Sequence, residues 1–190
     1  MKKLVVLLFL ISSVICFGQN REALKDIPAI KFYGIDYSLV KVYGAAEPSS
    51  RFKETFGKIN ELFITEPNKF DVSKYTGMKV KEVSLDAVNA VNNKISTYTL
   101  TTTNRDYSLN EKQITDLVKA LPIVQEPGTG LVLVAMLLNK ADNRGSYQVV
   151  FFNTETKEII SNWPTLGKAG GAGLRNFWAN SVYKVLKTMK

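Results

Sequence analysis

The chain has 190 residues, a formal net charge of +8 at pH 7 and no histidine. This length suits a single domain, and the missing histidine excludes a Ser-His-Asp triad, a histidine general base and a histidine-ligated zinc site. The lysines are scattered without a long basic block. We therefore favour a solvated surface over one that attracts lipid headgroups or envelope polysaccharide, and we predict no nucleic-acid partner.

The N-terminus has the order of a secretory signal peptide. A basic start precedes an apolar run over residues 4–17, and Gly18 is the small residue before the expected cut. The apolar run is shorter than the roughly 20 residues that span a bilayer, so we predict no transmembrane span. We expect a signal peptide over residues 1–18 and a single periplasmic or secreted domain over residues 19–190, with Gln19 as its first residue.

Cys16 is the only cysteine and lies inside the expected signal peptide. Val14 and Ile15 precede it, where a lipid-attachment site usually has small residues, so cleavage is favoured over a lipid anchor at Cys16. The cleaved chain then has no disulfide, thiol nucleophile or thiolate metal ligand. A hard metal ion would need carboxylates at a spacing that the sequence does not show, and we predict neither a metal nor a cofactor.

The first predicted strand covers residues 29–44, which are rich in aromatic and β-branched side chains. Its side chains alternate between two faces: Phe32, Gly34, Asp36 and Ser38 share one, and Tyr33, Ile35, Tyr37 and Leu39 share the other. Helical spacing of aromatic and aliphatic residues predicts a helix over residues 50–64.

The middle of the chain alternates between strands and helices. We predict a strand over residues 78–85, a short helix capped by Ser84, and either a strand or an extended arm over residues 97–103. Ser108 and Glu111 have capping-box spacing and open a further helix.

The C-terminal third predicts a three-stranded antiparallel meander followed by an amphipathic helix. The apolar run 131–138 reads as a central strand buried on both faces, and turn residues separate it from strands over 147–152 and 158–163. The predicted fold is therefore a single α/β or α+β domain, a mixed sheet with helices packed on it.

Asp36 is the best candidate for a catalytic acid. Tyr33 and Tyr37 flank it and could stack on a sugar ring, as in a glycoside hydrolase or a carbohydrate binder. No second acid can be placed near it from the sequence. We favour the other interpretation, in which Asp36 lies at a strand end and accepts hydrogen bonds from nearby amides.

Four glycines precede the last predicted helix in the stretch GKAGGAGLRNFW. The stretch fails both the P-loop and the dinucleotide-binding patterns, although a helix N-terminus can still bind an anion. Two interpretations remain. The first is an anion site made of Lys168, Gly170, Gly171, Gly173 and Arg175. The second, which we favour, is that the glycines only let the chain turn back onto the sheet.

Three stretches together resemble small uncharacterised exported proteins of the Bacteroidota: FGQ, KFYGIDYSLVKVYG and GKAGGAGLRNFWANSVYKVLK. The order of elements is also similar to the α/β modules of envelope lipoproteins, including the TolB N-terminal domain. The resemblance implies binding or assembly, without catalytic residues. We therefore predict a non-catalytic binding or assembly module whose partner is an envelope protein or polysaccharide. The alternative is an envelope hydrolase or carbohydrate binder that uses Asp36 with Tyr33 and Tyr37.

Overall fold

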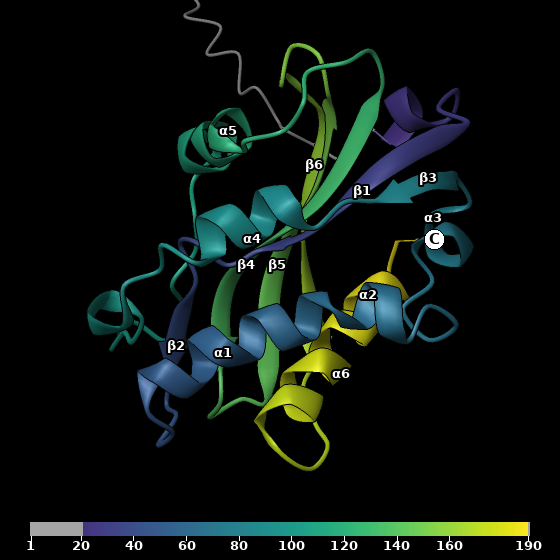
Figure 1. The fold of residues 1–190 in the computed structure, drawn as a ribbon. Helices are drawn as coiled ribbons and strands as arrows, with labels where there is room; N and C mark the ends of the chain where they lie inside the picture. The colour runs from purple at the N-terminus through teal and green to yellow at the C-terminus, as the bar shows by residue number, and fades with distance from the viewer. Residues whose placement is uncertain (1–20, 190) are drawn as a thin grey trace, which may run out of the picture.

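The computed structural model describes residues 21–189, which form one mixed sheet with helices packed on it (Figure 1). The strands are β1 (Ala29–Asp36), β2 (Lys41–Tyr43), β3 (Lys79–Val83), β4 (Thr129–Asn139), β5 (Arg144–Asn153) and β6 (Ile159–Lys168). The helices are α1 (Ser49–Asn60), α2 (Leu62–Thr65), α3 (Val72–Thr76), α4 (Asp86–Asn92), α5 (Glu111–Ala120) and α6 (Leu174–Leu186), with 3-10 turns η1 (Arg21–Leu24) and η2 (Thr97–Thr99). The expected signal peptide and Cys16 lie outside the described residues.

The sheet has the strand order β3-β1-β4-β5-β6, with β2 beside β4. Strand β1 pairs in parallel with β3 and β4, and β2 also pairs in parallel with β4, whereas β5 is antiparallel to both β4 and β6. Parallel neighbours need long crossover connections, and the segments that carry α1–α3 and α4–α5 provide them. The predicted fold class, a mixed sheet that ends in an antiparallel meander and a C-terminal helix, is confirmed.

Strand β4 lies inside the sheet and is buried on both faces, as its unbroken apolar run predicted. Leu131 and Leu133 belong to a cluster with side chains of α1 and α6, which we call the α1–α6 core. Val132 and Val134 belong to a cluster with side chains of α4 and α5, the α4–α5 core. The helices thus cover the sheet from both sides.

The alternation predicted for the first strand is wrong, because β1 contains a bulge at Gly34. The pairing register with β4 shifts between Phe32 and Ile35, and Gly34 has a φ of 88°, in the region that favours glycine. Phe32 and Ile35 therefore face the α1–α6 core, and Tyr33 faces the α4–α5 core. A Cβ on Gly34 would lie 2.7 Å from Leu85 Cδ2, so packing also requires glycine here.

Several predicted boundaries also differ. The first strand ends at Asp36, and a turn separates it from β2. Residues 97–103 begin as η2, and only Thr101 bridges to Val42, so the segment is an arm rather than a strand. The cap of α5 is Asn110, two residues after the predicted Ser108. Its side chain accepts from the Gln113 amide and the Gln113 side chain accepts from the Asn110 amide, each at 2.9 Å.

Helix α3 was not predicted from the sequence, and Asp71 caps it through a 2.9 Å hydrogen bond from the Lys74 amide. Helix α6 lies where the periodicity predicted the C-terminal helix. None of the helices within residues 21–189 has the length and apolar character needed to cross a bilayer.

Candidate functional site

Asp36 lies at the end of β1 and is 1% exposed. One carboxylate oxygen accepts a 2.7 Å hydrogen bond from the backbone amide of Ser38, which holds the turn between β1 and β2. Burial raises the pKa of Asp36, and the hydrogen bond from the Ser38 amide opposes that shift. This geometry matches the strand-end role that we favoured over catalysis.

The structure does not bring Tyr33, Asp36 and Tyr37 together in an open site. Tyr33 is 2% exposed and packs against Phe152 in the α4–α5 core, with ring centroids 5.6 Å apart. Tyr37 is fully buried on the opposite side of the sheet and stacks on Phe56 at 4.1 Å. Because both rings are covered by protein, a sugar has no access to their faces.

The glycine stretch before α6 shapes the connection from β6 to the helix. Gly171 and Gly173 have φ values of 112° and 78°, which only glycine adopts readily. The backbone amide of Gly170 donates to the carbonyl of Phe177 at 3.0 Å, so this amide is already used within the protein. The loop thus folds back onto the first turn of α6.

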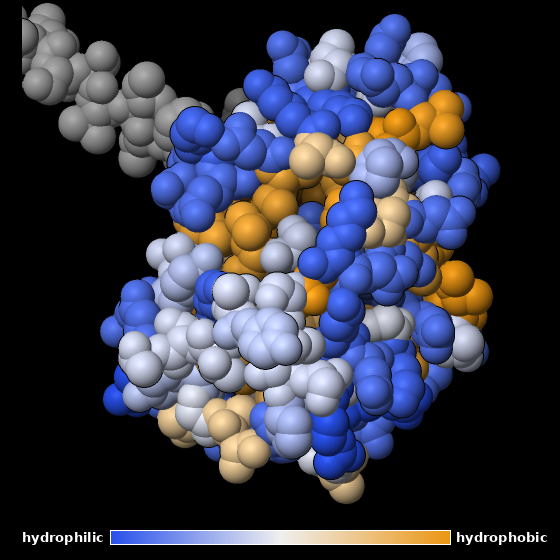
Figure 2. All heavy atoms as spheres, turned by 60° about the vertical axis from the view of Figure 1, so that its left-hand side comes forward, coloured by the Kyte–Doolittle hydropathy of each residue, from blue (hydrophilic) through white to orange (hydrophobic). Residues whose placement is uncertain are grey.

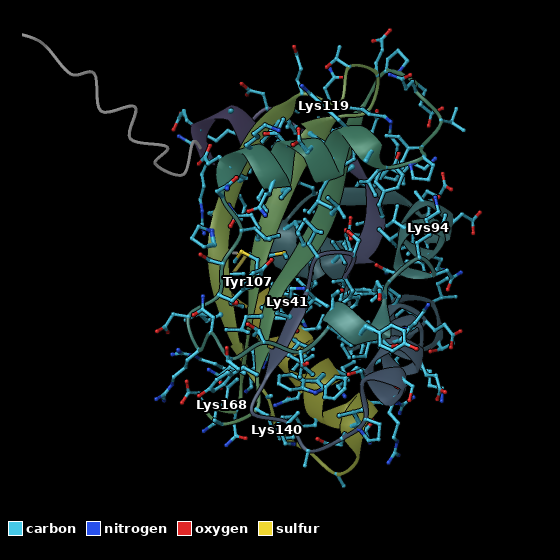
Figure 3. The ribbon with its side chains drawn as sticks, turned by 90° about the vertical axis from the view of Figure 1, so that its left-hand side faces the viewer. Lys41, Lys94, Tyr107, Lys119, Lys140 and Lys168 are labelled. Carbon is cyan, nitrogen blue, oxygen red and sulfur yellow. The ribbon has the colours of Figure 1, made fainter. Side chains whose placement is uncertain are left out.

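A cleft of about 250 Å³ lies where the N-terminus of α6 meets α1. Gly173 and Arg175 line it, together with three charged residues of α1: Arg51, Glu54 and Lys58. Lys168, Gly170 and Gly171 are not among its lining residues, and Figure 3 shows Lys168 at the lower end of the sheet with Lys140. The structure therefore brings together only part of the predicted anion site and adds basic residues from α1. Anion binding stays a prediction.

Arg51 and Lys58 were missed by sequence reasoning. They lie two helical turns apart in α1. This spacing alone indicates that the two side chains share one face of the helix. Nothing local to α1 indicates that this face lies beside Arg175, since more than a hundred residues separate them.

Residues 96–103 form an uncharged surface beside β2, which we call the Tyr98 surface. Tyr98 is 96% exposed, whereas Leu100, two residues later, is 1% exposed and anchors the segment in the core. The other members are serine and threonine: Ser96, Thr97, Thr99, Thr101, Thr102 and Thr103. Figure 2, which brings the β2 side forward, shows a broad area of intermediate hydropathy with hydrophilic areas at its sides and a hydrophobic area above it.

The backbone of the Tyr98 surface is held from both flanks. Val42 of β2 donates to the carbonyl of Leu100 at 2.8 Å and accepts from the amide of Thr102 at 3.0 Å. The Lys53 ammonium on α1 donates to the carbonyl of Ile95 at 3.0 Å, and the Lys41 ammonium donates to that of Thr99. Tyr98 is therefore presented on an ordered turn.

The carboxylates of the described part of the chain form no cluster of metal-ligand size. Within residues 21–189, no group of three or more histidine, cysteine, aspartate and glutamate side chains could hold a metal ion. Glu82 and Glu126 both lie near the Lys31 ammonium, at 2.8 and 3.4 Å. This ammonium neutralises part of their charge, and their contacts raise its own pKa.

Among known proteins, the chain has a weak structural likeness to a solved domain. No protein-family model and no curated protein matches the sequence. Among solved structures, the C-terminal domain of LpoB from Salmonella enterica is 11% identical, with a TM-score of 0.29, over 73% of this chain and 81% of that chain. A TM-score this low does not show a shared fold, so the architecture rests on the strand order described above. The resemblance to Bacteroidota proteins and to TolB stays a prediction.

Proposed function

We propose that the protein is an exported, non-catalytic binding module of the cell envelope that contacts its partner through the Tyr98 surface. The observation that carries this proposal is the Tyr98 side chain, which is 96% exposed on a segment tied to β2 and α1. The ring belongs to neither core cluster, so its exposure is not a by-product of core packing. A large ring presented on an ordered turn is suited to contact with a partner.

The chemistry of the surface favours a protein partner. Tyrosine provides a large contact area with few torsions to restrain, and serine and threonine hydroxyls both donate and accept hydrogen bonds. A side chain as exposed as Tyr98 projects from the surface, whereas sites for small molecules are usually concave. We therefore favour an envelope protein, and a polysaccharide is the alternative outcome of the test.

Export is proposed from the N-terminal sequence alone. The basic start, the apolar run and Gly18 support a signal peptide over residues 1–18 and a single domain over residues 19–190. The absence of catalysis is proposed because Asp36, Tyr33 and Tyr37, the residues of the alternative hydrolase, are all closed to substrate. Turnover of a glycoside, ester or phosphate substrate by the purified protein would overturn the non-catalytic assignment.

Site-specific photocrosslinking in the native envelope tests the binding surface. A photoreactive phenylalanine analogue at position 98 should give discrete adducts of higher mass. The same analogue at Val124, 74% exposed and outside the Tyr98 surface, is the matched control and should give none. Adducts at both positions, or at neither, contradict the proposal. An adduct that glycosidase returns toward the mass of the free protein indicates a polysaccharide.

The partner identified by crosslinking then allows an affinity measurement. Tyr98→Ala should weaken binding about 30-fold, the loss typical of an interface residue that dominates the binding energy. The urea midpoint of unfolding should stay unchanged, because the ring supports no core contact. Unchanged affinity in this variant would exclude Tyr98 as the centre of the interface.

A further inference from the structure

A second cavity lies between η1, β5, β6 and the residues that follow α3 and α6. Its volume is about 280 Å³. Six apolar side chains line it: Leu24, Ile27, Met78, Phe151, Trp163 and Met189. Arg21 and Lys25 of the N-terminal segment also line it. We call it the Trp163 pocket.

Trp163 forms one wall of this pocket. Its ring is 4% exposed and stacks on Phe151, with centroids 5.7 Å apart. The guanidinium carbon of Arg21 lies 4.8 Å from the centroid of the indole. The indole nitrogen is buried and has no hydrogen-bond partner among residues 21–189.

The pocket has basic side chains at its margin in addition to its apolar lining. Arg21 and Lys25 place two cationic side chains at its margin. Lys25 also pairs with Glu22 at 2.6 Å, but both side chains are mostly exposed, and a pair of this kind contributes little energy. An anionic group can therefore compete for the Lys25 ammonium.

We propose that the Trp163 pocket binds a medium-chain carboxylic acid, with its alkyl chain against the apolar wall and its carboxylate beside Lys25. The pocket volume lies just below the range of about 300–1,000 Å³ that is usual for small-molecule sites. It can therefore take one short chain rather than the two chains of a membrane lipid. The site is separate from the Tyr98 surface, so this proposal does not depend on the proposed function.

Octanoate titration followed by NMR tests the proposal. The chain has two tryptophans, and a Trp163→Phe variant assigns their indole N–H signals. Octanoate should shift the Trp163 signal in a saturable way and leave the signal of Trp178, which is fully buried in the α1–α6 core, in place. Acetate at the same concentration should shift neither, because it lacks the alkyl chain. An unmoved Trp163 signal, or equal shifts of both tryptophans, overturns the proposal.

The length of the acid's alkyl chain and the charge of Lys25 distinguish specific binding in this pocket from nonspecific binding. Each methylene removed from the acid should weaken binding about three- to fourfold. Lys25→Glu should weaken octanoate binding about threefold and leave octanol binding unchanged. The matched control is Lys112→Glu, which also removes an exposed lysine paired with an acid one helical turn away and should have no effect. An affinity that is independent of chain length, or equal in the Lys25 and Lys112 variants, overturns the proposal.

Discussion

The hydroxyl of Tyr147 on β5 and the hydroxyl of Ser181 on α6 lie 2.6 Å apart inside the α1–α6 core. The two can meet because α6 approaches the sheet over glycines. A Cβ on Gly145 would lie 2.6 Å from the Tyr147 ring and 3.0 Å from Ser181 Oγ, and a Cβ on Gly167 would overlap the Ser181 carbonyl oxygen. Gly167, the first glycine of the stretch before α6, is therefore a packing residue of β6.

This close approach predicts that Gly167→Ala is strongly destabilising. The added methyl group would force α6 away from β6, and we expect a loss of at least about 2 kcal/mol in the free energy of unfolding. Urea denaturation measures this loss of free energy of unfolding. Gly57→Ala is the control, because a Cβ at this position in α1 meets no atom within 4 Å. That variant should gain about 0.5–1 kcal/mol, and similar losses in both would contradict the packing role.

Asn60 should be essential for stability because it replaces a strand partner beside the β1 bulge. Its fully buried side chain accepts from the Ile35 amide at 2.8 Å and donates to the Ile35 carbonyl at 3.0 Å. Asn60→Ala removes the acceptor of the Ile35 amide, while the Ile35 carbonyl keeps the Asn92 side chain as a donor at 3.0 Å, and the change should cost about 2–3 kcal/mol. Asn93→Ala, an exposed asparagine just after α4, should change stability by less than about 0.5 kcal/mol. Equal urea midpoints for the two variants would refute this role.

Asp36 should make stability depend on pH. Burial raises its pKa in the folded state above the ordinary value of 3.8, so the folded protein holds the proton more tightly than the unfolded chain. Stability from this group is full below pH 3.8 and is lost as the pH rises through the folded-state pKa. Asp36→Asn does not ionise and keeps an acceptor for the Ser38 amide.

The stability of Asp36→Asn relative to the original protein should therefore increase as the pH rises from 3.8, and become constant above the raised pKa. Urea denaturation across a pH series measures this difference, in which the other carboxylates cancel. A flat difference, or one that grows toward acid pH, would show that burial does not govern this carboxyl.

Sulfate should bind at the N-terminus of α6 if the predicted anion site exists. At low ionic strength, sulfate should shift the backbone amide signals of residues 174–176, with chloride at equal ionic strength as the control. Because Arg51 lines the cleft and Lys168 does not, Arg51→Ala should weaken sulfate binding more than Lys168→Ala. Equal losses would support the loop arrangement predicted from the sequence, and no sulfate-specific shift would contradict an anion site altogether.

Local patterns were sufficient to predict most of the sheet and the last helix. The apolar run in β4 identified a strand buried on both faces, and turn residues on either side of β5 predicted the meander. The helical spacing around Trp178 identified α6. These features depend on residues within a few positions of one another, so the sequence alone contains them.

Only the tertiary structure decided the candidate sites. The bulge at Gly34 moved Tyr33 and Tyr37 to opposite cores, and it is stabilised by Asn60 and Asn92, which reach Ile35 from 25 and 57 residues away. The same holds for the other candidate sites. Arg51 and Arg175 line one cleft although they are distant in sequence, and the Trp163 pocket is lined by several distant segments. The exposure of Tyr98 likewise depends on how its segment packs in the folded protein. The sequence by itself determined which segments become strands and helices, because neighbouring side chains set those preferences. Which side chains are buried, exposed or brought together depends on long-range packing, which local periodicity does not encode.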